Sequence, residues 1–210
     1  MNKIKTAKLL ALTVFIGWIS ACSNVATLPQ ATTHASLTSN IDNYNYLIGP
    51  GDTLTIFVWR HEDVSGSFTV RPDGKITTSL VEDIQVSGKT PTQLARDIEN
   101  ELAKYIREPI VTVSVSGFRG PFSEQVRVIG EATSPQAISY SENMTLLDLM
   151  IAVGGLTEFA DGDDAKIIRV VNGQQQEYGV RLTSLIKEGD ISANVDILPG
   201  DILIIPEAWF

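Results

Sequence analysis

The sequence predicts an α+β protein made of two small modules, one over residues 44–117 and one over residues 123–210. Three observations support this fold class. Apolar and polar residues alternate in several short runs, which is the pattern of half-buried strands. Each module has a single helical stretch, and clusters of Gly, Pro, Asn and Asp separate the runs. The sequence Gly-Phe-Arg-Gly-Pro over residues 117–121 indicates a linker between the modules.

The first module opens with a tight turn and a strand. The turn consists of Gly49, Pro50, Gly51 and Asp52. Proline fixes φ at the second position and glycine accepts a positive φ at the third. Residues 54–58 then alternate as a strand does. A second turn consists of Pro72, Asp73 and Gly74, and an Asp-Gly pair between the strand-like runs 67–70 and 75–78 predicts a hairpin.

A helix and a further strand complete the first module. Residues 90–93 read Thr-Pro-Thr-Gln, in which threonine is a good N-cap, proline suits the first helical turn and glutamine can close a capping box. Apolar residues then recur at helical spacing to Ile106, and Tyr105 belongs to this stripe. Alternating valines over residues 111–115 predict a strand with one solvent-facing side.

The second module is predicted to wrap strands over one short buried helix, as a small β-grasp-like domain does. The helix is predicted over residues 144–153, which are apolar nearly all round apart from Asp148, and Thr145 is its candidate cap. Gly154 and Gly155 supply its left-handed stop. The predicted strands are 125–130, ending at Gly130, then 166–171 and 174–180 joined by an Asn-Gly turn, and 202–205 after a second Pro-Gly-Asp turn.

Composition and charge exclude several classes of function. The chain has 210 residues, of which 43% are hydrophobic and 20% charged, so it is neither wholly disordered nor a disulfide mini-protein. Its formal charge of −9 disfavours binding to nucleic acid. A single cysteine excludes an intrachain disulfide and a cysteine-based metal centre, and two histidines leave little for imidazole chemistry. We therefore expect no cofactor and no metal.

The N-terminus is predicted to be a signal peptide over residues 1–21. Three lysines precede an uncharged stretch over residues 9–21, which is too short to span a membrane as a helix. It ends in a sequence that resembles a bacterial lipobox, with cleavage between Ala21 and Cys22, so Cys22 is the expected site of lipidation. An ordinary cleaved signal with an incidental cysteine is the alternative. Residues 22–43, rich in Ser, Thr, Ala and Asn, are predicted to form a flexible tether.

Several stretches together resemble the outer-membrane polysaccharide export (OPX, Wza-like) family of lipoproteins. The first module resembles the polysaccharide export domain and the second resembles the SLBB domain, a soluble ligand-binding β-grasp. The chain departs from the family pattern at Ser79, Glu82 and Gln136, which affects loop shape and leaves the fold unchanged. The resemblance rests on residues 48–54, 70–76, 84–90, 102–109 and 111–113 in the first module, and on residues 126–131, 135, 145–148 and 153–156 in the second.

The resemblance implies a role without catalysis. It implies a component of a capsule or exopolysaccharide export complex, anchored by lipid in the outer membrane and facing the periplasm. The implied partners are further copies of the chain in a ring, an inner-membrane co-polymerase or chain-length regulator, and the polysaccharide in transit. Longer members add a C-terminal helix that crosses the membrane; since this sequence ends at Phe210, a separate channel protein is expected. Its last residues resemble exopolysaccharide exporters associated with exosortases.

Other side chains were considered for chemistry. Trp59, Trp209 and Phe210 are candidates for an interface or for stacking on sugars, because aromatic rings present apolar faces. For Trp59, packing at the end of a strand is the favoured alternative. The aspartates at 161, 163 and 164 form a short acidic cluster, for which a solvated turn is expected because a calcium loop needs a longer ligand series. Adjacent carboxylates, as in Glu62-Asp63, point to opposite sides of a strand and do not themselves form a glycosidase pair.

Two other functions stay open from the sequence. One is a cell-envelope lipoprotein that binds glycan without transporting it. The other is an envelope glycan hydrolase or lyase, for which the sequence supplies no recognisable motif. Co-purification with a chain-length regulator separates the exporter from the binding lipoprotein, and an activity screen tests the enzyme.

Overall fold

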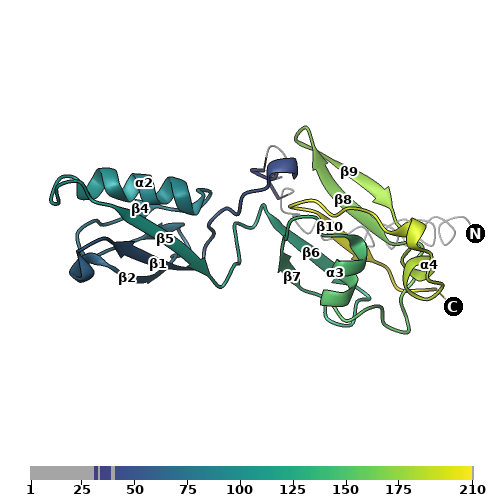
Figure 1. The fold of residues 1–210 in the computed structure, drawn as a ribbon. Helices are drawn as coiled ribbons and strands as arrows, with labels where there is room; N and C mark the ends of the chain where they lie inside the picture. Colours follow the sequence, from purple (N-terminus) through teal and green to yellow (C-terminus); the bar gives the residue numbers. More distant parts are fainter. Residues whose placement is uncertain (1–30, 33, 39–40, 210) are drawn as a thin grey trace, which may run out of the picture. The chain divides into compact units, whose positions relative to one another are not determined.

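The computed structural model describes residues 31–32, 34–38 and 41–209, and the predicted fold class is confirmed (Figure 1). Mixed short strands and few helices form two hydrophobic cores, one for each predicted module. Within the described residues, no helix is both long enough and apolar enough to cross a membrane. The predicted signal peptide, with Ala21 and Cys22, lies outside the described residues.

The first domain is a three-stranded antiparallel sheet with one helix on one face (Figure 1). The sheet order is β2–β1–β5, and the buried side chains of Leu54, Ile56 and Val58 point from β1 into the core with Leu94 and Ile98 of α2. The short helix η2 (Ile41–Asn43) precedes this domain. The elements of the domain are β1 (Thr53–Val58), η3 (Glu62–Val64), β2 (Gly66–Thr69), β3 (Lys75–Ile76), β4 (Ile84–Gln85), α2 (Pro91–Leu102) and β5 (Val111–Ser116).

Helix α2 starts as predicted and ends earlier than predicted. Thr90 accepts from the backbone N–H of Gln93, and the Gln93 side chain accepts from the N–H of Thr90, so the capping box is complete. The helix ends at Leu102. Tyr105 follows in a turn and is 65% exposed, so its assignment to the apolar stripe was wrong. The stripe closes one turn earlier because the chain then turns toward Pro109.

The Pro72-Asp73-Gly74 turn is present, but the strands beside it belong to different sheets. The turn closes through hydrogen bonds between Arg71 and Lys75 and from Gly74 to Arg71. Strand β2 pairs with β1, while β3 pairs with β4 in a separate two-stranded sheet. The predicted hairpin is therefore wrong beyond its first pair. Val70 extends the β1–β2 pairing, because it exchanges backbone hydrogen bonds with Gly51 and Asp52 just before β1. The residues up to Val70 therefore pair with the β1 segment and not with β3.

The second domain is a five-stranded mixed sheet in the order β7–β6–β10–β8–β9. Strand β10 runs parallel to β6, and the other neighbours are antiparallel. Strand β7 and helix α4 were not predicted. The elements are β6 (Gln125–Gly130), β7 (Ala137–Ser139), α3 (Leu146–Ala152), β8 (Lys166–Val171), β9 (Gln174–Gly179), α4 (Leu182–Ile186), η4 (Ile191–Ala193) and β10 (Ile202–Ile205).

Helix α3 inserts one side into the core of this domain. Leu146, Leu149 and Met150 are buried there, whereas Ile151 is 70% exposed, so the helix is not buried all round as predicted. Asp148 is the N3 residue of a capping box with Thr145, and the Thr145 hydroxyl lowers the pKa of the Asp148 carboxyl. This polar exception in the apolar run is therefore the start signal of the helix.

The segment predicted as a tether makes specific contacts in its described part. Ser36 and Thr38 donate their hydroxyls to the carboxylate of Glu124, at 2.8 and 2.6 Å, and the Leu37 N–H donates to the same carboxylate. Glu124 is buried. Residues 36–38 therefore share one buried acceptor, and the flexibility of the tether stays a prediction.

Candidate functional site

The Gly-Pro-Gly-Asp turn that opens the first domain is organised by the buried carboxylate of Asp52. One oxygen accepts from the N–H of Gly49 at 2.9 Å and from the hydroxyl of Tyr46 at 2.5 Å. The other accepts from the N–H groups of Arg119 and Gly120 at 2.6 and 3.3 Å. Four donors therefore satisfy the charge, which a buried carboxylate requires. The turn holds the segment that follows β5.

Close backbone contact explains the first glycine of this turn. A Cβ built on Gly49 would lie 1.9 Å from the carbonyl carbon of Gly120, so only glycine fits beside the linker. The carbonyls of the linker are also bonded: those of Phe118 and Arg119 accept from the Ser139 hydroxyl, and the Arg119 carbonyl accepts from Gln125. Side chains distant in sequence thus satisfy the backbone of the linker.

Tyr46 is the phenol partner of Asp52 and packs edge-on against Phe118, with ring centroids 5.4 Å apart. Burial, and then the hydrogen bond to Asp52, raise the pKa of Tyr46 well above its ordinary value. Tyr44 packs in the same way on Tyr140, and burial raises the pKa of Tyr44 to about 12. Both phenols stay neutral and act as donors.

The second Pro-Gly-Asp turn, over residues 199–201, repeats the first in its internal bonding. Asp201 accepts from the N–H of Leu198, three residues back, just as Asp52 accepts from Gly49. Here the charge is balanced by Arg169, which donates two hydrogen bonds at 2.8 and 2.7 Å. The hydrogen bond to Asp201 raises the pKa of Arg169. The short internal echo in the sequence is therefore a shared turn-to-strand solution with a different partner at each site.

The remaining family-motif glycines serve the fold. Gly130 has a φ of 88° and lies where an added Cβ would be 2.0 Å from the carbonyl oxygen of Ile205, so β6 ends against β10. Gly154 and Gly155 have positive φ, and the Gly155 N–H bonds to the Met150 carbonyl to stop α3. These positions shape the domain and present no side chain to a ligand.

The candidate aromatic residues lie apart in the sequence and in the fold. Trp59 follows β1, is 54% exposed, and stands edge-on to Phe57 with centroids 6.3 Å apart. Trp209 follows β10 and is fully exposed. Phe210 lies outside the described residues. Among the described residues, no aromatic ring packs against Trp209, so an interface role for Trp209 and Phe210 stays a prediction.

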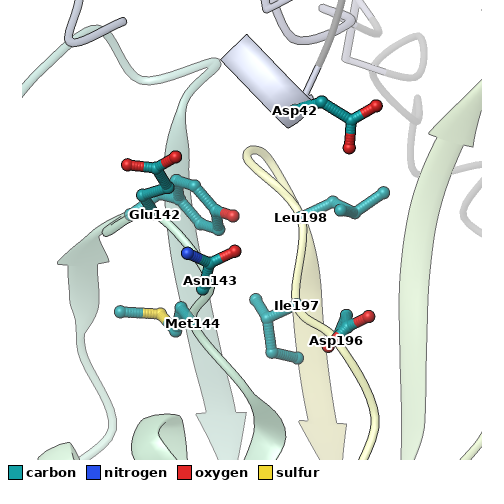
Figure 2. Close-up of a pocket in the computed structure, with 8 residues that line it drawn as sticks. Asp42, Glu142, Asn143, Met144, Asp196, Ile197 and Leu198 are labelled. Carbon is teal, nitrogen blue, oxygen red and sulfur yellow. The ribbon is translucent and has the colours of Figure 1, made fainter. Parts of the chain in front are cut away.

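A pocket of about 300 Å³ opens in the second domain beside η2 (Figure 2). It carries three carboxylates, from Asp42, Glu142 and Asp196, together with apolar and amide side chains. Figure 2 shows these acids on separate segments around the opening. In the part of the chain that the structure describes, no group of three or more His, Cys, Asp or Glu side chains could hold a metal ion.

The short acidic cluster after α3 has an internal role. Asp161 accepts from the N–H of Asp164, and Asp163 accepts weakly from the N–H groups of Thr183 and Ser184 at the start of α4. The cluster thus forms a turn and a helix cap. Glu62 and Asp63 lie in the first turn of the short helix η3.

Sequence reasoning missed three polar residues that organise the structure: Tyr46, Glu124 and Arg169. Each partner is distant in sequence, from 6 residues for Tyr46–Asp52 to 88 for Ser36–Glu124. Arg169 does carry a local signal, because it is a lone charge inside the apolar run 167–171. A charge in such a strand is expected to have a buried partner.

Comparison with known proteins defines the class of this chain. Residues 40–116 match the model of the polysaccharide biosynthesis/export protein family, and residues 125–180 match the SLBB domain. The chain therefore contains a polysaccharide biosynthesis/export domain followed by an SLBB domain. Members of this family are export proteins and not enzymes, in agreement with the expected lack of catalysis.

Three curated relatives illustrate the similarity. The EPS I polysaccharide export outer membrane protein EpsA of Ralstonia nicotianae is 29% identical over 77% of this chain and 47% of its own length. The exopolysaccharide production protein ExoF of Rhizobium meliloti is 27% identical over 69% of this chain and 36% of its own. The flagellar L-ring protein of Colwellia psychrerythraea is 27% identical over 96% and 84%. The chain spans about half the length of the EpsA relatives.

Proposed function

We propose that this protein is a non-catalytic component of an exopolysaccharide export complex at the outer membrane. The observation that carries the proposal is the ordered pair of domains, export then SLBB, each built on its own core and each opened or closed by a Pro-Gly-Asp turn. Relatives named as polysaccharide export outer membrane proteins support it.

Deletion of the gene tests this function. We expect the deletion strain to lose secreted polysaccharide while precursor synthesis continues, and a plasmid copy to restore secretion. Normal secretion in the deletion strain would contradict the proposal. Because one relative is a flagellar L-ring protein, swimming is measured in parallel, and a strain that loses motility but secretes normally would assign the chain to that assembly.

The proposed attachment is a lipid anchor on Cys22 that holds the protein at the outer membrane, facing the periplasm. It is supported by the position of the only cysteine, directly after an uncharged stretch with a positive head. Cys22→Ser is expected to release the protein from the membrane fraction and to lower secretion. Unchanged fractionation would refute the anchor. A matched Ser23→Ala variant is expected to stay membrane-bound.

We also propose self-association, which the outer face of the five-stranded sheet supports. Side chains that alternate with the core residues form an aliphatic patch: Ile129 pairs with Ile204, and Ile168 with Ile202, and all four are at least partly exposed. Exposed Arg127 and Lys166 flank the patch in the same two rows, opposite Ile202 and Ile204. Strands with apolar residues on both faces are typical of sheets covered on both sides. A second copy that covers this patch would be one step toward the predicted ring.

Light scattering of the detergent-solubilised full chain tests this association. Ile204→Glu is expected to shift the protein toward the monomer, whereas Ile151→Glu, on the exposed side of α3, is expected to leave the mass unchanged. A monomeric wild type would contradict the proposal. Co-purification from membranes also tests the predicted chain-length regulator. Its absence, with glycan bound, would favour a glycan-binding lipoprotein that does not transport.

A further inference from the structure

The sheet of the export domain has a second face, opposite α2, which carries hydroxyl groups in register. Thr69 of β2, Thr53 of β1 and Ser116 of β5 form one cross-strand row. Ser67, Thr55 and Ser114 form the next. Thr112 begins a third row beside Phe57. The core residues of β1 alternate with these positions, so all of them point to the same side. We call these seven Ser and Thr positions the hydroxyl face.

The hydroxyl face carries no charge and its side chains are available. None of the residues in β1, β2 or β5 is charged, although 20% of the chain is. Solvent-facing edge strands such as β2 and β5 commonly carry lysine or another charge. Thr55, Ser67, Thr69, Thr112 and Ser114 are exposed, and their hydroxyls have no hydrogen-bond partner within the described part of the chain.

An exposed aromatic pair borders the rows. Phe57 lies in the row of Thr112 and is 45% exposed, and Trp59 follows on the same side. The two rings stand at 73° to each other, and Trp59 is 54% exposed. Exposed Ile110, whose carbonyl accepts from the Trp59 N–H, lies next to them. The face thus combines hydroxyls with an apolar, aromatic end.

We propose that this face, with Phe57 and Trp59, contacts the polysaccharide chain as it passes; the inference rests on the proposed function. A serine or threonine hydroxyl both donates and accepts, as a sugar hydroxyl does. Aromatic rings offer an apolar surface to the C–H groups of sugar rings. Equivalent hydroxyls repeat along and across the strands, so a sugar chain keeps similar partners when it shifts by one row. Without charge, the face neither repels an acidic polymer nor holds it tightly.

A second protein copy is a poorer match to this face. The cores of protein–protein interfaces are depleted in serine and enriched in aromatic residues, Met and Arg. The hydroxyl face has three serines, four threonines and no Met or Arg. The aliphatic patch on the five-stranded sheet is the better candidate for self-association. Loss of self-association on changing the hydroxyl face would therefore count against the proposal.

Tryptophan fluorescence gives the direct test of binding. The measurement uses the detergent-solubilised full chain with Trp209→Phe. The fluorescence of a Trp59→Phe, Trp209→Phe double variant is subtracted from its fluorescence, so the difference reports Trp59. The probe is the polysaccharide purified from the culture medium of the strain that carries the gene. We expect at least a twofold fall in acrylamide quenching of Trp59 on addition of the polymer, and loss of this effect in Thr55→Glu. Unchanged quenching at saturating polymer would overturn the proposal.

Secretion from a complemented deletion strain gives the cellular test. Thr55→Glu places a charge on the hydroxyl face, and Thr92→Glu places the same charge on an exposed position of α2, across the sheet. We expect at least a fivefold loss of secreted polymer for Thr55→Glu and less than twofold for Thr92→Glu, at equal protein levels. If Thr55→Glu does not fold, the neutral double variant Thr55→Val, Thr112→Val is tested in its place. We expect it to lower the amount of secreted polymer at least threefold.

The two levels of the argument fail differently. A deletion strain that secretes normally would defeat the proposed function. A deletion strain that fails to secrete, rescued fully by folded hydroxyl-face variants, would defeat this inference alone. Hydroxyl-face variants that neither restore secretion nor self-associate, as measured by light scattering, would assign the face to a second copy. This result would overturn the proposed contact with the glycan.

Discussion

Replacement of Asp52 by asparagine removes the charge that holds the first turn to the linker. Each oxygen of the carboxylate accepts two hydrogen bonds, from Tyr46 and Gly49 on one side and from Arg119 and Gly120 on the other. Asparagine keeps only one oxygen. Its amide is best placed toward Tyr46, whose hydroxyl can rotate to accept, and the N–H of Gly49 is then left without an acceptor.

The cost follows from these contacts. An unpaired buried donor costs about 1–3 kcal/mol, and the remaining bonds lose the strengthening that the charge gave them. We expect Asp52→Asn to lower the free energy of unfolding by about 3 kcal/mol. The matched change Asp73→Asn, in an exposed turn beside Arg71, is expected to cost less than about 1 kcal/mol.

Urea unfolding of the full chain measures both variants. Each variant carries Trp209→Phe, and the signal of a matched Trp59→Phe, Trp209→Phe chain is subtracted, so the fluorescence difference reports Trp59 in the same domain. If the free energy of unfolding of Asp52→Asn lies within about 0.5 kcal/mol of the wild-type value, the assigned role of the carboxylate is refuted. Equal losses for the two aspartates would show that burial and the four donors do not set the cost. The expected result is a clear separation, with the slope of the transition unchanged.

Three further predictions concern neighbouring features. The pKa of Tyr46 is raised in the fold, so the phenol contributes its full stabilisation of the fold below the unfolded pKa of about 10, and this stabilisation is lost as pH rises through the folded pKa. Above about pH 10, the melting temperature of Tyr46→Phe should therefore fall less than that of the wild type. Gly49→Ala should cost more than about 3 kcal/mol in urea unfolding, against less than about 1 for Gly179→Ala, where an added Cβ meets nothing within 4 Å. Thr90→Ala should lower the free energy of unfolding by about 1 kcal/mol, because the helix loses its N-cap. A change of nearly zero in the same assay would contradict the stabilising role of the capping box.

Local signals allowed much of the fold to be predicted. The capping residues Thr90 and Thr145 begin α2 and α3 at the expected positions, because a cap is decided within four residues. The Asn-Gly pair at 172–173 has positive φ at both residues and joins β8 to β9 as predicted. Each of these features depends on neighbours in the sequence.

Features decided by distant partners could not be read in the same way. The Asp-Gly turn at 73–74 predicted its own geometry correctly, but the choice of β1 as partner for β2 depends on a strand more than ten residues upstream. The exposure of Tyr105 depends on where α2 ends against the sheet. The hydroxyl face is visible in the sequence as alternating Ser and Thr, yet only the register of three strands assembles it into rows.

The aromatic candidates show the same division. Trp59 and Trp209 were candidates for an interface or for stacking on sugars, and both are exposed. Only the fold shows that Trp59 continues a face with Phe57, whereas Trp209 follows the last strand. What either residue contacts is a matter for the binding and secretion experiments.

The amount of polymer on each side of the outer membrane, measured in the deletion strain and in the strain complemented with the full chain, tests export most directly. Export by a passive component predicts that the deletion strain releases little or no polymer to the medium, that precursor synthesis continues, and that polymer of unaltered linkage is released again on complementation. Equal release with and without the gene, or polymer whose linkages depend on the protein, would contradict the account.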